Sequence, residues 1–114
     1  QIYGGPGATL GGILANNVVV GHRHSGITID PTFQATFTND HNLAFRNVSE
    51  SFTPGAGTLF VDPLFATAND FRLSTSSPAK DAGLNARVPA DITLDLARLP
   101  RIQGVAVAMG AYEK

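Results

Sequence analysis

The densest group of polar side chains is the run from Gly21 to Gly26, which reads GHRHSG. In an extended chain His22 and His24 project from the same side, because successive side chains alternate. A zinc ion needs at least one further protein ligand, and a neighbouring segment could bring Asp30, Asp40 or His41. We expect a solvated turn here, keep His22 and His24 as weak metal candidates, and expect no cofactor.

The acidic residues do not form a recognisable catalytic set. Inverting glycoside hydrolysis needs two carboxylates that flank the scissile bond, and the paired aspartates of that chemistry are missing. A lyase would need an arginine or lysine base beside a calcium ion held by a cage of acids, and Arg23, Arg46 and Arg72 are not accompanied by such a cage. Five aspartates instead suit turns or caps, where carboxylates accept backbone hydrogen bonds: Asp62, Asp70, Asp81, Asp91 and Asp95. We therefore expect the chain not to be an enzyme.

Three arginines favour an alternative function. Arg23, Arg46 and Arg72 would lie at or beside outward positions of aligned strands, and a basic stripe of this kind would suit an acidic polysaccharide. Most of the seven phenylalanines are expected to point inward, whereas Phe60 is the middle residue of the triplet 59–61 and is expected to point outward. The alternative is thus a carbohydrate-binding or vestigial carbohydrate-active module, with these three arginines and Phe60 as ligand-binding residues.

Length and composition exclude several classes of protein. The chain has 114 residues, which is about one small domain. A net charge of −1 without runs of like charge gives no basic face for a nucleic acid. No stretch approaches the roughly 18 apolar residues of a membrane helix, and no signal peptide is visible. Without cysteine the sequence does not indicate a redox compartment.

Short apolar alternations predict an all-β fold. They are three to five residues long and are separated by the turn residues Gly, Pro, Asn and Asp. The expected strands are residues 17–20, 26–29, 35–38, 42–45, 58–61 and 70–73. No helical period is present, so long helices are not expected.

The expected strands recur at similar intervals. Residues 17–20, 42–45 and 70–73 share a polar start and an apolar-x-apolar triplet, at steps of 25 and then 28 residues. A second row links residues 35–37 to 59–61 at a step of 24. Such steps are typical of a wound repeat, with the middle residue of each triplet facing outward. Asn17 and Asn42 would then align, either as an amide ladder or as ordinary turn residues.

The second half of the chain contains a series of motifs in a specific order. They are Val61-Asp62-Pro63-Leu64-Phe65, Asn69-Asp70-Phe71-Arg72-Leu73, Ser77-Pro78-Ala79-Lys80-Asp81-Ala82-Gly83, a stretch from Asp91 to Asp95, Pro100-Arg101-Ile102, and Met109-Gly110-Ala111-Tyr112-Glu113. This series, over about residues 59–114, resembles the C-terminal segment of bacterial right-handed parallel β-helix proteins of the pectate-lyase-like (pectin lyase-like) type. The resemblance implies a surface or secreted protein, and hence an extracellular or cell-surface location. The family usually has a Gly-Asn turn before the Pro-Arg pair, where this chain has Leu96-Ala97-Arg98-Leu99.

The expected architecture is a short right-handed parallel β-helix of about three to four coils, in a single domain of residues 1–114. Residues 1–15 would be flexible or a partial N-terminal coil, residues 16–77 would form the coils, and residues 78–114 an irregular C-terminal cap. The cap would cover one end with six buried side chains: Val88, Ile92, Ile102, Val105, Val107 and Met109.

The N-terminal end would stay uncovered in this architecture. Residues 1–15 are rich in glycine and would seal the end poorly, and an uncovered end exposes unpaired strand edges. We therefore predict a homodimer through the N-terminal end. The predicted function is a non-catalytic structural or assembly module that associates with itself.

Overall fold

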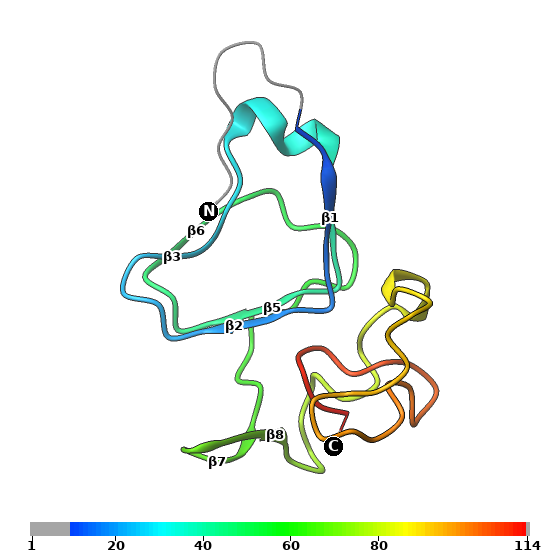
Figure 1. The fold of residues 1–114 in the computed structure, drawn as a ribbon. Coiled ribbons are helices and arrows are strands. Elements are labelled where there is room, and N and C mark those ends of the chain that lie inside the picture. Colours follow the sequence, from blue (N-terminus) through cyan, green and yellow to red (C-terminus); the bar gives the residue numbers. More distant parts are fainter. Residues whose placement is uncertain (1–9, 114) are drawn as a thin grey trace.

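The computed structural model describes residues 10–113 and is drawn in Figure 1. In chain order its elements are β1 (Gly12–Ala15), β2 (Val18–Val20), β3 (Ser25–Thr28), η1 (Pro31–Thr36), β4 (Phe37–Asp40), β5 (Leu43–Phe45), β6 (Ser49–Ser51), β7 (Phe65–Thr67), β8 (Asp70–Leu73) and η2 (Asn85–Arg87), where η denotes a 3₁₀ helix. No helix in these residues is long and apolar enough to cross a membrane, in agreement with the prediction of no membrane span.

The first six strands form two successive passes of the chain that pair side by side. We call residues 12–28 the first pass and residues 37–51 the second pass. β1 pairs with β4, β2 with β5 and β3 with β6, all in parallel. Val18 lies opposite Leu43, so the predicted step of 25 residues between these two strands is confirmed.

Both passes bend at two matching corners. Asn16 and His41 form the corner after the first strand of each pass, and Gly21 and Arg46 form the next one. All four residues have positive φ angles, between 51° and 74°. A residue with left-handed backbone bends the course of the chain sharply, and glycine and asparagine adopt this conformation at the lowest cost. These corners give the passes the angular path seen in Figure 1.

The helix η1 connects the two passes. Asp30 accepts a hydrogen bond from the Thr32 amide at its start, and Pro31 occupies the first turn, where its missing N–H costs nothing. Phe33 turns its ring into the core and is buried. The strand expected at residues 35–38 therefore begins only at Phe37, because the preceding residues are helical.

The prediction of a right-handed parallel β-helix with three to four coils is wrong. No solenoid forms within the described residues, whose strands make four separate two-stranded sheets, three parallel and one antiparallel. The second predicted row is wrong, because Phe37 pairs with Gly12 and Leu59 forms one isolated bridge with Leu43 instead. The first row does not continue into residues 70–73. β8 instead pairs with β7, because a hairpin closes a much shorter loop than pairing across 28 residues would.

The strands β2 and β5 contribute side chains to two separate clusters. Val19 packs toward the inside of the passes, against a cluster of Ile27, Ile29 and Phe33. Val18 and Leu43 point to the other face and pack in a cluster with Leu73, Ala79, Ala108 and Met109. The expected orientation, with the middle residue of each triplet facing outward, is therefore wrong for β2.

Residues 78–113, which we call the C-terminal segment, follow an irregular path beside the passes (Figure 1). The segment covers the outer face of β2 and β5, so the predicted cap over one end is also wrong. Val107 and Met109 are buried as expected and Val88 is half-buried, but three of the six expected cap residues are exposed: Ile92, Ile102 and Val105. The prediction that residues 1–15 are flexible or form a partial coil concerns mainly residues 1–9, which lie outside the described residues.

Candidate functional site

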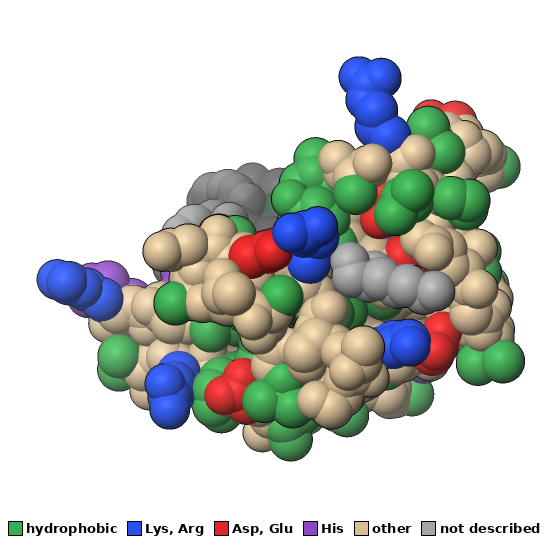
Figure 2. All heavy atoms as spheres, turned by 90° about the horizontal axis from the view of Figure 1, so that it is seen from below, with side chains coloured by type: hydrophobic (Ala, Val, Ile, Leu, Met, Phe, Trp, Pro, Cys, Tyr) green, Lys and Arg blue, Asp and Glu red, His purple; other side chains and the backbone are tan. Residues whose placement is uncertain are grey.

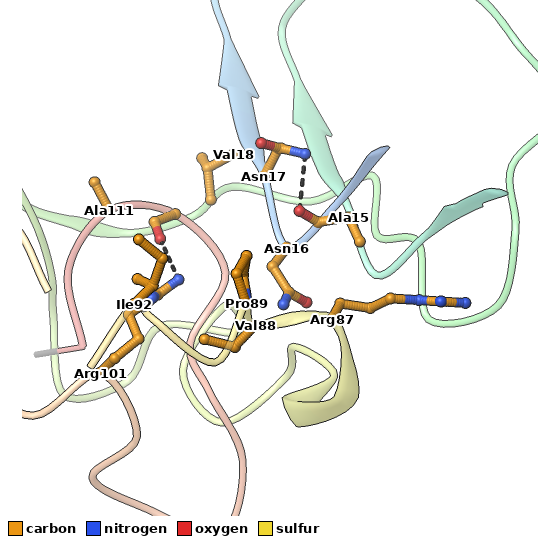
Figure 3. Close-up of a pocket in the computed structure, with 11 residues that line it drawn as sticks. Ala15, Asn16, Asn17, Val18, Arg87, Val88, Pro89, Ile92, Arg101 and Ala111 are labelled. Carbon is orange, nitrogen blue, oxygen red and sulfur yellow. Dashed lines mark hydrogen bonds between the residues drawn. The ribbon is translucent and has the colours of Figure 1, made fainter. Parts of the chain in front are cut away.

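A concave groove lies where the β1–β2 corner meets the C-terminal segment (Figure 3). Its volume is about 430 Å³, which is within the size range of small-molecule sites. The corner contributes residues 15–18, and the C-terminal segment contributes Arg87, Val88, Pro89, Ile92, Arg101, Gly110 and Ala111. None of these side chains is a hydroxyl, thiol, imidazole or carboxylate, so the described lining offers no nucleophile and no general base.

Asn16 attaches the C-terminal segment to this corner. Its side-chain amide donates to the Leu84 carbonyl at 3.1 Å and accepts from the Leu84 amide at 2.8 Å. Its own carbonyl accepts a hydrogen bond from the Gly110 amide at 2.7 Å. The side chain is buried, and its left-handed backbone, with φ of 59°, directs these groups toward the segment.

The side-chain amides of Asn17 and Asn42 form a series of hydrogen bonds that leads from the groove into the protein. The side chain of Asn17 donates to Oδ1 of Asn42 at 2.8 Å. Asn42 in turn donates to the Leu14 carbonyl and to Oδ1 of Asn39, each at 2.8 Å. Because Asn42 is fully buried, these bonds satisfy polar groups that would otherwise be costly to bury. Asn17 and Asn42 thus form a single amide pair between the two passes, and no ladder extends from it within the described residues.

Arg87, one of the two arginines of the groove, forms hydrogen bonds to a carboxylate within the protein. Arg87 donates through Nε and Nη2 to Oδ2 of Asp40, at 3.2 and 2.8 Å. The Arg87 hydrogen bond holds the pKa of Asp40 below its ordinary value. Figure 3 shows the guanidinium of Arg87 extending away from the other labelled residues. Arg87 therefore joins the C-terminal segment to the end of β4.

Arg101, the second arginine of the groove, pairs with a carboxylate on the other side of the groove. Arg101 forms an ion pair with Glu113 and donates to the Gly110 carbonyl at 2.9 Å. Glu113 is buried and also accepts from the Ala108 amide at 3.2 Å. Burial raises the pKa of Glu113, because the charged form loses hydration. Both arginines of the groove thus hold the segment together, which is a structural arrangement.

The His22–His24 cluster lies at the exposed corner between β2 and β3. The His22 amide donates to Oδ1 of Asn47 at 2.9 Å, which ties the cluster to the corresponding corner of the second pass. Arg46 lies at that second corner, with its guanidinium 5.2 Å from the Phe45 ring centroid. Figure 2 shows basic and histidine side chains together at this end of the molecule, at the left of the view. We call the set of His22, Arg23, His24 and Arg46 the basic corner.

The other predicted site residues lie away from the basic corner. Arg72 is in β8 and forms an ion pair with Asp70, with an N–O distance of 2.6 Å. Phe60 is 53% exposed and lies 6.3 Å from Phe52, measured between ring centroids. Within residues 10–113 no three His, Cys, Asp or Glu side chains come close enough to hold a metal ion. Two of the four predicted ligand-binding residues, Arg23 and Arg46, are therefore brought to corresponding corners.

The first pass has one strand edge that faces away from the second pass. Among the described residues, β1, β2 and β3 each pair with a single strand. The Leu43 amide donates to the Asn17 carbonyl, and the Gly21 amide donates to the Phe45 carbonyl. Since backbone groups alternate along a strand, those of Val18 and Val20 are directed the other way. We call this side of β1–β3 the outer edge.

The sequence analysis missed the residues that attach the C-terminal segment, namely Asn16, Arg87 and Glu113. An adjacent pair of asparagines before an apolar strand is a weak signal, because asparagine tolerates left-handed backbone. The partner of Asn16 is 68 residues away, and no local pattern indicates a contact over that separation.

No family model, curated protein or solved structure matches this chain.

Proposed function

We propose that the chain is a non-catalytic assembly module that associates with a second copy through the outer edge. The observation that supports this proposal is that β1, β2 and β3 pair on one side only within the described residues. A strand edge of this kind presents N–H and C=O groups to which another strand can add. Two copies related by a two-fold axis would pair these edges in antiparallel fashion.

The groove gives independent support to a non-catalytic role. Its described lining contains no group that could act as nucleophile or general base. Its two arginines already have carboxylate partners, Asp40 and Glu113. The polar groups of this region thus stabilise the packing of the C-terminal segment, as expected for a structural module.

The alternative function is binding of an acidic polysaccharide, and the basic corner favours it. Arg23 and Arg46 are exposed, and neither forms an ion pair with a described residue. A thermal-shift titration with acidic and neutral oligosaccharides tests this alternative, because a ligand of the folded state raises the melting temperature. A shift that acidic sugars cause and Arg23→Ala abolishes would favour it. The extracellular location implied by the family resemblance would be compatible with either function.

Sedimentation equilibrium of the chain over micromolar concentrations tests the assembly proposal. Val20→Pro removes an N–H that points away from β5, so it should block edge pairing while it leaves the β2–β5 ladder intact. Val20→Thr is the matched control, because it keeps both the N–H and the branched shape. The proposal predicts that the wild type and Val20→Thr form a larger assembly than Val20→Pro, which stays folded but loses the outer-edge contact.

A wild-type monomer at every concentration would overturn the proposal. A Val20→Pro variant that is folded by circular dichroism and forms the same assemblies as the wild type, with the same dissociation constants, would exclude the outer edge as an interface. If Val20→Pro fails to fold, Val20→Lys provides the second test, because a charged edge residue also discourages strand addition.

A further inference from the structure

The C-terminal segment exposes an unusual amount of apolar surface. Between residues 92 and 105, six large apolar side chains are at least 42% exposed, and Val105 reaches 90%. They are Ile92, Leu94, Leu96, Leu99, Ile102 and Val105, and we call them the apolar surface. Figure 2 shows hydrophobic side chains on the lobe at the right of the view, where this segment lies. Soluble monomers rarely expose contiguous apolar patches larger than a few hundred Å², and larger patches mark interaction sites.

Residues 93–101 form a hairpin, and its tip carries Leu96 and Leu99 of the apolar surface. The Asp95 amide donates to the Leu99 carbonyl at 2.8 Å, and the Arg101 amide donates to the Thr93 carbonyl at 2.9 Å. The buried carboxylate of Asp95 accepts from the Leu99 amide at 2.8 Å and from the Glu113 amide at 3.1 Å. Because the polar groups bond inside the protein, Leu96 and Leu99 are held outward before any partner binds.

A second groove lies at the base of the same hairpin. Its volume is about 360 Å³, and its lining includes Val88, Pro89, Ile92, Pro100 and Ile102. The chain thus has an apolar projection at the hairpin tip and an apolar depression at the hairpin base. A projection and a depression on one surface are what a two-fold contact between identical chains requires.

The exposed charges of this region are also self-complementary. Asp91 adjoins the second groove in sequence and Arg98 lies at the hairpin tip, and both are exposed. Neither forms an ion pair with a described residue, whereas Arg101 is already paired with Glu113. When the tip of one copy enters the groove of another, Arg98 of the first approaches Asp91 of the second.

We propose that two copies of this chain associate through the apolar surface, with the hairpin tip of each copy in the second groove of the other. The six residues expose roughly 600 Å² together, while a standard interface buries about 800 Å² per partner. Their exposed area is therefore comparable with what one partner of a stable dimer buries. This contact is separate from the outer edge, so each copy has two association surfaces.

The test measures the dimer dissociation constant by sedimentation equilibrium in a Val20→Pro background, which removes the contribution of the outer edge. Leu96→Asp should raise Kd at least about tenfold, whereas Val48→Asp, at an equally exposed apolar residue elsewhere, should leave it unchanged. Arg98→Glu should also raise Kd, because each contact would then bring two acids together. The double variant Arg98→Glu/Asp91→Arg should restore the wild-type Kd.

Three outcomes would overturn this proposal. They are a monomer in the Val20→Pro background at every concentration, an unchanged Kd in a folded Leu96→Asp variant, and a double charge variant that stays as weak as Arg98→Glu. Folding of every variant is checked by thermal unfolding, and the series is repeated in the wild-type background if Val20→Pro does not fold. If only the outer-edge proposal is wrong, Arg98→Glu should still raise Kd and the double charge variant should still restore it. The two proposals can therefore be refuted separately.

Discussion

Replacement of Asn16 by alanine tests the central packing argument, because this residue makes two side-chain hydrogen bonds and has left-handed backbone. Each lost hydrogen bond costs about 1 kcal/mol. An alanine at a φ of 59° adds about 1 kcal/mol of backbone strain. We therefore expect Asn16→Ala to lower the free energy of unfolding by about 3 kcal/mol, measured by urea denaturation.

Asn16→Gly separates the two contributions. It removes the same hydrogen bonds but adopts the left-handed conformation readily, at the cost of a more flexible unfolded chain. It should therefore be less destabilising than Asn16→Ala by roughly 0.5–1 kcal/mol. Asn69→Ala is the control, because this exposed asparagine has no side-chain hydrogen bond to a described residue. Its effect should stay within about 0.5 kcal/mol.

Two results would refute this reasoning. One is an Asn16→Ala variant within about 0.5 kcal/mol of the wild type, which would mean that the amide does not hold the segment. The other is an Asn16→Gly variant that is less stable than Asn16→Ala, which would exclude the backbone argument. Hydrogen exchange gives a local readout, since the amides of Leu84 and Gly110 should exchange faster in both variants.

Three further predictions concern charge and packing. The Arg87 hydrogen bond lowers the pKa of Asp40, so this group stabilises the fold above its ordinary pKa, and that stability is lost as pH falls through the lowered value. Urea midpoints toward about pH 2 should therefore fall less for Asp40→Asn than for the wild type. Burial raises the pKa of Glu113, so its contribution is full below the ordinary pKa and decreases as pH rises through the raised value. The wild type should lose stability over that interval, and Glu113→Gln should not. Gly55→Ala would place a Cβ 1.7 Å from the Asn39 carbonyl oxygen, and thermal unfolding should show a loss of at least about 2 kcal/mol.

The pairing of the two passes could be predicted from the sequence because it depends on a local repeat. The two asparagine-led strands have the same pattern at a step of 25 residues, and β2 and β5 pair in that register. A buried amide between them, from Asn17 to Asn42, strengthens the same register. The expected strand at residues 70–73 was also correct as a strand, since it is β8. Alternation identifies a strand well, because it reports burial on one face.

Which strand pairs with which depends on a competition between possible partner strands. The alternation of apolar residues in the sequence does not report the outcome of that competition. β8 could pair with an earlier strand or with β7, and pairing with β7 has the lower entropic cost of loop closure. The burial or exposure of individual apolar residues could not be predicted from the sequence either. Val105 and Val107 have the same side chain and lie two residues apart, yet Val105 is exposed and Val107 is buried. Their difference depends on the irregular path of the C-terminal segment, which has no period that could be read from the sequence.

The position of the C-terminal segment links the two association surfaces. The segment packs on Val18 and Leu43 at the side of the passes, and within the described residues it forms no backbone hydrogen bond with β1, β2 or β3. If Asn16 fixes this position, Asn16→Ala should weaken association through the apolar surface, because the hairpin and its groove lose their common support. Association through the outer edge should persist, because the β2–β5 register does not depend on the Asn16 side chain. A variant that weakened both contacts equally would show that the passes themselves need the segment in order to fold.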